Sequence, residues 1–316
     1  MATFLVTGGA GFIGSHLVCA LVRQGHRVRV LDDLSTGKRS NLEEVWDQID
    51  WIEGSICDEP LVAKAVQGVD CVFHQAALAS VPLSVERPAA SHAVCATGTL
   101  VVLDRARRAG VRRVVYASSS AVYGDQPTAA KRESDPMKPI SPYGAAKAAG
   151  ELYCQAFYKT YGLETVCLRY FNVFGPRQDP ASPYAAVIPL FLSAMLRGER
   201  PTIFGDGRQS RDFVYVENVV EANLLAAECP KAAGKSFNVG AGRATDLLML
   251  VSLLNDVLGT CIEPQFGPAR PGDIRESLAD ICEARLVLGY TPKIDLREGL
   301  ARTAEWFRTS AAAQCG

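Results

Sequence analysis

The stretch TFLVTGGAGFIGSHLVCALVRQG, Thr3–Gly25, decides the fold that we predict. Its first five residues are apolar or β-branched and predict a buried strand. A glycine-rich turn follows, and residues 15–24 have the composition of a helix that Gly25 would end. Strand, glycine turn and helix in this order are typical of a nucleotide-binding unit, and a purely structural loop is the alternative.

The turn carries Gly8, Gly11 and Gly14. Glycines at such positions permit a tight turn, a close approach of the backbone to a pyrophosphate, and close packing of the helix on the strand. The next predicted strand, RVRVLD, ends at Asp32. An acidic residue there is placed to bind a ribose 2′-hydroxyl and would repel a 2′-phosphate. This context predicts a dinucleotide site that prefers NAD to NADP.

Strand-like and helix-like segments continue to alternate along the first half of the chain. Further strands are predicted at residues 50–54, 70–77, 112–119 and 165–171, and helices at 97–110 and 151–162. Strands that alternate with helices form parallel sheets covered on both faces. The predicted fold class is therefore α/β, with a Rossmann-like doubly wound parallel sheet.

Composition excludes several other classes of protein. The 33 Lys and Arg residues balance the 34 Asp and Glu residues, so neither a nucleic acid nor a membrane surface is an expected partner. No signal peptide or membrane-spanning run is evident, and we expect a cytoplasmic protein. The 10 cysteines form no CxxC pair and are expected to be reduced and buried. The four histidines lack the spacing of metal ligands, so no metal is expected.

The segment SPYGAAK, residues 141–147, places a tyrosine four residues before a lysine. Pro142 suits the first turn of a helix, on which Tyr143 and Lys147 would share one face. A neighbouring ammonium favours the phenolate, so we expect a lowered tyrosine pKa and a proton acceptor usable near neutral pH. An exposed surface pair without function is the alternative.

Taken together, these motifs resemble the extended short-chain dehydrogenase/reductases, and among them the nucleotide-sugar epimerases. The similarity rests on the glycine turn at 8–14, the serines at 118–120 before AVYG, the Tyr143/Lys147 pair, and RYFNVFGPRQ at 169–178. It extends from the first strand to about Leu300, with the motifs in the order of the family.

The resemblance implies that Ser119, Tyr143 and Lys147 are catalytic. In the family mechanism, Tyr143 removes the proton of the sugar 4-hydroxyl while the C4 hydride passes to the nicotinamide. Ser119 hydrogen-bonds that oxygen, and Lys147 lowers the pKa of the tyrosine and holds the nicotinamide ribose. The 4-keto sugar then turns over and takes the hydride back on its other face.

For NAD binding, the resemblance implies a larger set of residues. They are Gly8, Gly11, Phe12, Ile13, Gly14, Asp32, Asp33, Ser55, Ile56, Gln75, Ala76, Ala77, Tyr143, Lys147 and Tyr170. Two positions depart from the family pattern, because relatives usually have Asp where this chain has Ser55 and Asn where it has Cys95. Both exchanges remove hydrogen-bonding capacity, so NAD could be held less tightly than in relatives.

The second half of the chain is interrupted by prolines and resembles the substrate domain of the family. We expect an NAD-binding Rossmann domain at 1–172, rejoined by about 211–240, and a mainly UDP-sugar-binding domain at 173–316. Asn172, Arg211 and Arg270 are expected on the diphosphate and Asp273 on the uridine ribose. The full set of expected substrate-binding residues is Ser80, Ser119, Ser120, Tyr143, Asn172, Ala186, Val187, Thr202, Ile203, Phe204, Arg211, Arg270, Asp273 and Ser277.

The reaction, the sugar and the assembly follow from further features of the resemblance. Dehydratase and decarboxylase relatives carry an acid shortly after the catalytic Ser/Thr, where this chain has Ser120 and Ala121. This favours a 4-epimerase. A small residue at Ser277 leaves room for an acetamido group, so UDP-N-acetylglucosamine and UDP-N-acetylgalactosamine are the expected pair. The alternatives are UDP-glucose and UDP-galactose, a simple reductase, or a non-catalytic NAD sensor. The helices at 99–108 and 151–161 are expected to pair in a homodimer.

Overall fold

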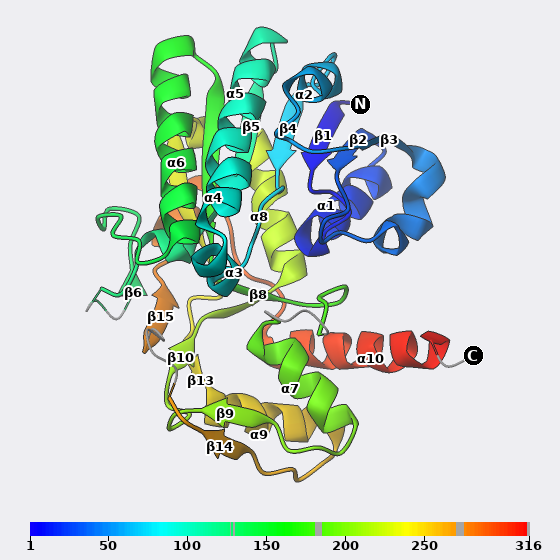
Figure 1. The fold of residues 1–316 in the computed structure, drawn as a ribbon, viewed down its shortest axis with the longest axis vertical. Helices are drawn as coiled ribbons and strands as arrows, with labels where there is room; N and C mark the ends of the chain where they lie inside the picture. Colours follow the sequence, from blue (N-terminus) through cyan, green and yellow to red (C-terminus); the bar gives the residue numbers. More distant parts are fainter. Residues whose placement is uncertain (127, 129, 181–184, 270–274, 315–316) are drawn as a thin grey trace.

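The computed structural model describes residues 1–126, 128, 130–180, 185–269 and 275–314. Its centre is a seven-stranded parallel sheet in the order β12-β7-β5-β4-β1-β2-β3 (Figure 1). This order confirms the predicted doubly wound α/β fold. The strands are β1 (Thr3–Thr7), β2 (Arg27–Asp32), β3 (Ile49–Glu53), β4 (Cys71–His74), β5 (Arg113–Ser119), β7 (Glu164–Tyr170) and β12 (Lys235–Val239).

Helices cover both faces of this sheet and produce two hydrophobic cores. Successive strand residues point to opposite faces, so Val6 of β1 joins one core and its neighbour Leu5 joins the other. The first core includes residues of α1 (Phe12–Arg23) and α8 (Val216–Glu228). The second includes residues of α2 (Glu59–Ala65), α5 (Thr99–Arg108) and α6 (Pro142–Tyr161). Burial on both faces explains why the inner strands β1, β4, β5 and β7 are mostly apolar, whereas the edge strand β3 is only partly buried and carries two acidic residues.

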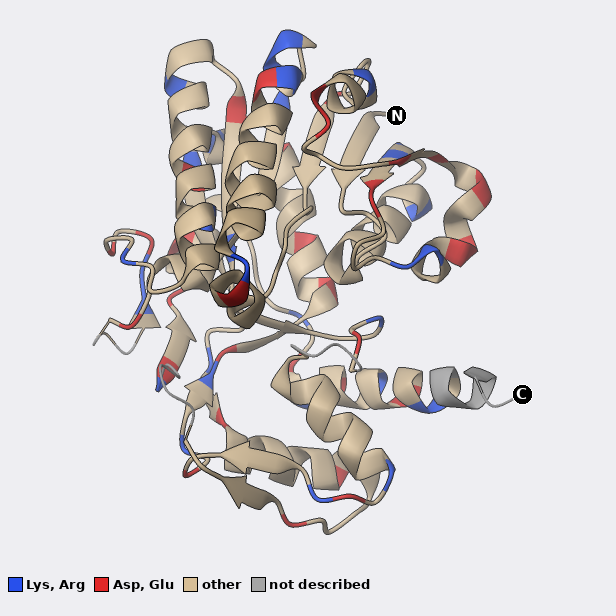
Figure 2. Ribbon diagram, viewed as in Figure 1, with Lys and Arg blue, Asp and Glu red and all other residues tan. Residues whose placement is uncertain are grey.

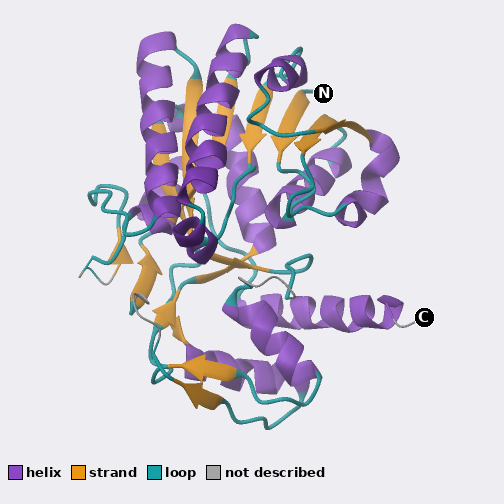
Figure 3. Ribbon diagram, in the orientation of Figure 1, coloured by secondary structure: helices purple, strands orange, loops and turns teal. Residues whose placement is uncertain are grey.

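A smaller lobe with short strands lies beside the carboxyl ends of the main strands (Figures 1 and 3). One sheet has the order β13-β10-β15-β6, and β11-β8 and β14-β9 form two-stranded ladders. The strands are β6 (Ala130–Lys131), β8 (Asn172–Phe174), β9 (Thr202–Phe204), β10 (Ser210–Arg211), β11 (Phe213–Tyr215), β13 (Thr245–Asp246), β14 (Gln265–Gly267) and β15 (Glu276–Ala279). The helices are α7 (Val187–Leu196), α9 (Leu247–Leu258) and α10 (Leu296–Gln314).

The chain crosses between the two lobes more than once. After the small-lobe strand β10, α8 packs beside α1, and β12 then pairs in parallel with β7 from Lys235↔Val166 to Val239↔Tyr170. The chain then returns to the small lobe through β13 and α9. Two short helices, α3 (Val81–Glu86) and α4 (Pro88–His92), lie between β4 and α5.

The remaining sequence-based expectations concern thiols, charge and membranes. All nine cysteines in the described part of the chain are unpaired, but Cys57, Cys261 and Cys282 are exposed, so the expectation of general burial was wrong for these three. They lie in polar surface segments rather than in the core. Figure 2 shows positive and negative residues mixed over both lobes in this view. Over the described residues, no helix is long and apolar enough to span a membrane.

Candidate active site

The glycine turn after β1 forms one wall of a cleft with a volume of about 260 Å³. Gly8 has a φ of +68°, which favours glycine, and a Cβ there would lie 2.7 Å from the backbone of Ala76. A Cβ on Gly14 would lie 2.1 Å from the carbonyl oxygen of Gly8. The tight turn therefore requires both glycines, and it directs the N-terminus of α1 into the cleft.

Asp32 lies at the end of β2 on the same cleft, where the sequence placed it. One carboxylate oxygen accepts a hydrogen bond from the Ala10 amide at 2.8 Å, and the other accepts one from the Leu34 amide, also at 2.8 Å. Burial raises the pKa of this carboxyl, and the two amides oppose that effect. Because each carboxylate oxygen has two lone pairs, the side chain can still accept hydrogen bonds from a diol.

Nearly all the predicted cofactor residues line this cleft. Ser55 is the exception. Its neighbours Gly54 and Ile56 line the cleft, but Ser55 does not. Sequence reasoning missed several lining residues. All of them except Val94, which lies in the helical segment Ala93–Gly98, belong to the last residues of a strand or to the loop after it, a position that could have indicated them. The missed residues are Leu31, Ser35, Thr36, Gly54, Leu78, Ala79, Val94, Ala117 and Ser118.

Tyr143 and Lys147 enter the cleft from the first turns of α6. The Ser141 side chain caps this helix by accepting a hydrogen bond from the Gly144 amide at 3.1 Å, and Pro142 occupies its first turn. The Lys147 ammonium is buried and donates to the Ala117 carbonyl oxygen at 2.7 Å, at the end of β5. The two side chains therefore share one helix face, as predicted, and the surface-pair alternative is wrong.

The expected lowering of the Tyr143 pKa is not what the structure shows. Burial raises the pKa of Tyr143, and a hydrogen bond with Ser119 opposes this only in part. The Lys147 nitrogen lies 5.9 Å from the centre of the Tyr143 ring and is directed at the Ala117 carbonyl. Sequence spacing gave the shared face but not the desolvation, which dominates here.

The three consecutive serines at the end of β5 have different environments. Ser119 faces Tyr143 and also accepts a hydrogen bond from the Ala121 amide at 3.2 Å. Ser118 is buried and donates to the Glu151 carboxylate. Ser120 begins the short 3₁₀ segment Ser120–Val122 and lines neither of the two clefts. Ser80 is also outside both clefts, where it caps α3 through the Leu83 amide.

A second cleft, of about 300 Å³, lies in the small lobe and contains six of the predicted substrate residues. Its predicted members are Asn172, Ala186, Val187, Thr202, Phe204 and Arg211. Ile203 is fully buried in the core of the small lobe, because alternate residues of β9 point to opposite sides. Tyr170 lines the first cleft and Asn172 the second, so the two clefts approach each other at the end of β7.

Ser277 lies on β15, where it is paired in register with Arg211 of β10. Its side chain is half-buried, and its carbonyl oxygen accepts a hydrogen bond from the Asp212 amide at 2.7 Å. It lines neither cleft, but its strand partner lines the second. The predicted residues Arg270 and Asp273 lie outside the described residues.

A protein-family model described as "NAD dependent epimerase/dehydratase family" matches residues 4–240. The chain belongs to this family. The UDP-glucose 4-epimerase of Mycolicibacterium smegmatis is 42% identical over 311 residues, which are 97% of this chain and 99% of that relative. The family resemblance inferred from the motifs is therefore confirmed.

Solved structures of other family members match this epimerase/dehydratase closely. The UDP-N-acetylglucosamine 4-epimerase of Methanobrevibacter ruminantium, in complex with UDP-N-acetylmuramic acid, has a TM-score of 0.94 and 43% identity over 98% of this chain and 99% of that chain. The Thermotoga maritima UDP-glucose 4-epimerase with UDP-glucose has a TM-score of 0.93 and 43% identity, over the same shares of the two chains.

Family membership makes this epimerase/dehydratase an NAD-dependent enzyme. The shape of the site also fits this cofactor. The glycine turn leaves space for a pyrophosphate beside the backbone, which a Cβ at these positions would fill. Asp32 at the other side of the cleft is arranged to accept hydrogen bonds from a ribose diol. The expected NAD preference is consistent with both observations.

Proposed function

We propose that this epimerase/dehydratase is a UDP-sugar 4-epimerase that interconverts UDP-N-acetylglucosamine and UDP-N-acetylgalactosamine. The observation that carries the proposal is that Tyr143 and Lys147 of α6 line the NAD-type cleft, and that Ser119 at the end of β5 hydrogen-bonds Tyr143. The adjoining cleft of the small lobe offers Arg211 and Asn172 for a diphosphate.

The catalytic roles follow from chemistry that the side chains can perform. NAD, when bound, supplies a hydride acceptor and the positive charge of the nicotinamide ring. Tyr143 removes the proton of the sugar 4-hydroxyl and later returns it, while Ser119 hydrogen-bonds the same oxygen. Lys147 would hold the ribose of bound NAD, and its ammonium supplies a fixed positive charge on the tyrosine side of the cleft. Rotation of the 4-keto sugar before reduction inverts the C4 configuration.

Binding roles are proposed for the residues that the sequence singled out. The residues of the first cleft, from Gly8 to Tyr170, hold NAD, and those of the second hold the UDP part of the substrate. Arg270, Asp273 and Ser277 complete the substrate site in this proposal. Residues 1–172 with about 211–240 form the NAD-binding domain, and the rest of 173–316 is mainly the UDP-sugar domain.

Epimerisation is favoured over dehydration or decarboxylation by a local feature. Breaking the C6–O bond or removing the C5 proton needs a further acid or base beside the sugar. Ser120 and Ala121 follow Ser119, and neither side chain is an acid. In this proposal a 4-epimerase needs only Ser119 at the end of β5 and the Tyr143/Lys147 pair of α6.

The purified enzyme tests the proposal directly. The supernatant of the denatured protein should contain NAD, because a cofactor regenerated in each cycle need not leave the site. Incubation with UDP-N-acetylglucosamine should produce UDP-N-acetylgalactosamine, measured by chromatography, without a net change in NADH absorbance. A stoichiometric change in NADH absorbance would instead identify a simple dehydrogenase or reductase, with formation of NADH meaning oxidation of the sugar and loss of NADH its reduction. Absence of turnover with every UDP-sugar would support an NAD sensor.

Interconversion of UDP-glucose and UDP-galactose is the second candidate function. It is favoured by the curated relative from M. smegmatis and by the T. maritima structure, both of which are UDP-glucose 4-epimerases. In our proposal these sugars are the weaker substrates. A wild type that converts only UDP-glucose and UDP-galactose would overturn the acetamido assignment.

A homodimer in the cytoplasm is the assembly and location that we propose. α6 exposes Leu152 and Tyr153, and α5 lies beside it on the same face of the sheet with Leu100 and Val101 only partly buried (Figure 1). An apolar helix face of this kind suits an isologous two-fold contact with a second copy.

Light scattering should give twice the chain mass of 34.0 kDa at micromolar concentration. Leu152→Glu should shift this assembly toward the single chain, because it places a charge in the contact. Leu286→Glu is the matched control, since Leu286 is an exposed leucine on a different element and should leave the mass unchanged. A wild-type mass of 34.0 kDa would refute the dimer.

A further inference from the structure

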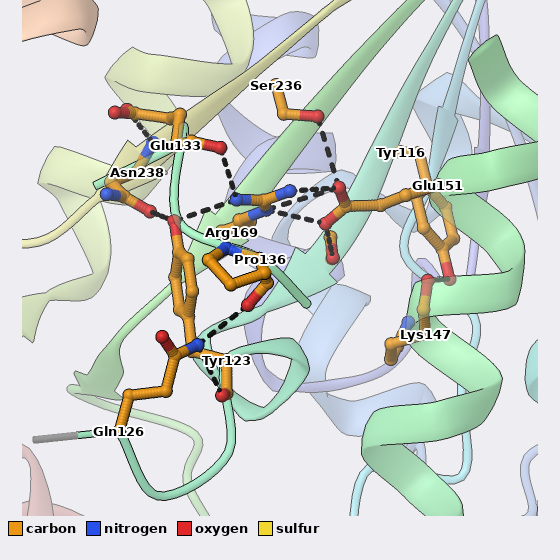
Figure 4. Close-up of polar contacts among 11 residues, drawn as sticks. Tyr116, Tyr123, Gln126, Glu133, Pro136, Lys147, Glu151, Arg169, Ser236 and Asn238 are labelled. Carbon is orange, nitrogen blue, oxygen red and sulfur yellow. Dashed lines mark hydrogen bonds and ion pairs between the residues drawn. The ribbon is translucent and has the colours of Figure 1, made fainter. Parts of the chain in front are cut away.

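A buried ion pair lies one helical turn beyond Lys147 (Figure 4). Glu151 of α6 is fully buried, and the guanidinium of Arg169 on β7 contacts both carboxylate oxygens, at 2.8 Å from Nη2 and 2.9 Å from Nε. Desolvation of two charges offsets much of their attraction, so such a pair is weak evidence for a purely stabilising role. The position of the Glu151–Arg169 pair beside the active site indicates a functional role.

Glu151 is connected to the catalytic residues by two routes. Along α6, Tyr143, Lys147 and Glu151 follow at intervals of four and therefore share one face. Across to β5, Glu151 accepts a hydrogen bond from Ser118, which lines the first cleft and directly precedes Ser119. The Glu151 carboxylate therefore connects α6, which carries Tyr143, to β5, which carries Ser119.

Arg169 extends the network toward the small lobe. It donates to the Tyr123 hydroxyl at 2.8 Å, and this hydroxyl donates to the Asn238 amide oxygen at 2.6 Å. The Asn238 amide nitrogen in turn donates to the carbonyl oxygens of Lys131, the last residue of β6, and Asp280, which directly follows β15. β6 and β15 are paired, and Figure 4 shows the part of this network around Arg169. β15 is the strand that holds Ser277.

We propose that Glu151 and Arg169 are positioning residues, which fix α6 against the end of β5 so that Tyr143, Lys147 and Ser119 keep their productive geometry. The proposal deepens the 4-epimerase function and rests on it. Catalytic groups must be held to within about 0.5 Å by the residues behind them. Here the reacting groups come from a helix and from a strand, and the Glu151 carboxylate bridges those two elements.

The test is the double variant Glu151→Leu/Arg169→Met, which removes both charges and leaves neither one orphaned. We expect kcat to fall by about 10- to 100-fold, as for a small displacement of catalytic groups, with KM changed by less than about threefold. Bound NAD should be retained. A kcat above about a third of the wild-type value would overturn the proposal.

The matched control is Arg113→Met/Glu164→Leu. This pair joins β5 to β7 at the amino ends of the two strands, away from the active site, with 2.8 Å between Arg113 Nη2 and Glu164 Oε2. Arg113 is as buried as Arg169 and also donates to three backbone carbonyl oxygens, while its partner Glu164 is partly exposed, so a loss of thermal stability is expected for this variant too. Its kcat should stay within about twofold of the wild type, because no catalytic group lies at that end. An equal fall in kcat for both double variants would mean a general structural effect and would overturn the proposal.

A third variant and a structural measurement cover the remaining outcomes. If the Glu151/Arg169 double variant does not fold, Ser118→Ala takes its place, because it removes only the hydrogen bond between Glu151 and β5. This variant should lower kcat by about 3- to 10-fold without changing KM. An unchanged kcat would overturn the proposal. If the wild type turns over no UDP-sugar, the proposed function fails on its own. The inference can then still be tested by a crystal structure of whichever of these variants folds. Lys147 should lose its 2.7 Å contact with the Ala117 carbonyl oxygen in that structure. An intact contact would overturn the proposal.

Discussion

Tyr143→Phe should lower turnover of the preferred UDP-sugar by about a thousandfold, within the range for loss of a general acid–base group. The ring is retained in the wall of the cleft, so the dissociation constant of the UDP-sugar, measured by calorimetry, should change by less than about twofold. The loss belongs to kcat because the deleted oxygen acts on the sugar 4-hydroxyl during the reaction. Ser119→Ala, which removes the hydroxyl facing Tyr143, should be nearly as damaging.

Tyr290→Phe provides the control for this prediction. The Tyr290 hydroxyl is also buried and donates to the Gly240 carbonyl oxygen at 2.9 Å, but the residue lines neither cleft. Its loss should cost about 1 kcal/mol of unfolding free energy and leave kcat unchanged. If the Tyr143→Phe enzyme kept more than about a tenth of wild-type turnover, Tyr143 would no longer be the base.

Ser277→Tyr should abolish turnover of UDP-N-acetylglucosamine, by more than about a hundredfold in kcat/KM, and spare UDP-glucose. In our proposal Ser277 stands beside the C2 substituent of the sugar, and a large side chain there would exclude the acetamido group by steric conflict. Specificity constants for the two substrates, measured on wild type and variant, give the result directly.

Ser277→Ala separates the two contributions of the serine. Because alanine keeps the space but lacks the hydroxyl, the acetamido substrate should remain preferred, with kcat/KM lowered by about tenfold or less. A Ser277→Tyr enzyme that lost both substrates equally would mean a disturbed strand, since Ser277 is paired with Arg211 in the β10–β15 ladder. Equal specificity constants of the wild type for both sugars would mean a merely permissive site.

The parts of the fold that could be predicted are those in which local pattern and tertiary environment agree. The apolar strands are buried on both faces, so their sequences contain few polar interruptions and their positions were predicted to within a few residues. The glycine turn could be predicted because backbone geometry requires glycine at Gly8 and Gly14. Asp32 followed from its place at the end of the second strand.

The parts that could not be predicted depend on contacts between residues far apart in the chain. The raised pKa of Tyr143 comes from burial, which spacing on a helix does not report. Arg169 and Glu151 are 18 positions apart, and their pairing depends on how α6 lies across β7. A charged residue within the apolar run TVCLRYF was the available signal, because an arginine in a fully covered strand needs a partner.

The edge position of β12 has a consequence for the synthesis of the chain. β7 ends at Tyr170, but its neighbour begins at Lys235, and the 64 residues between them, 171–234, must leave the ribosome first. At about 5–20 residues per second, the nascent protein exposes an unpaired apolar edge for several seconds. Open edges of this kind recruit other strands, so a fragment that stops before Lys235 should aggregate rather than fold as an independent module. We therefore expect the two lobes to fold as one unit, because the main sheet is complete only after the small-lobe segment before β12 has been synthesised.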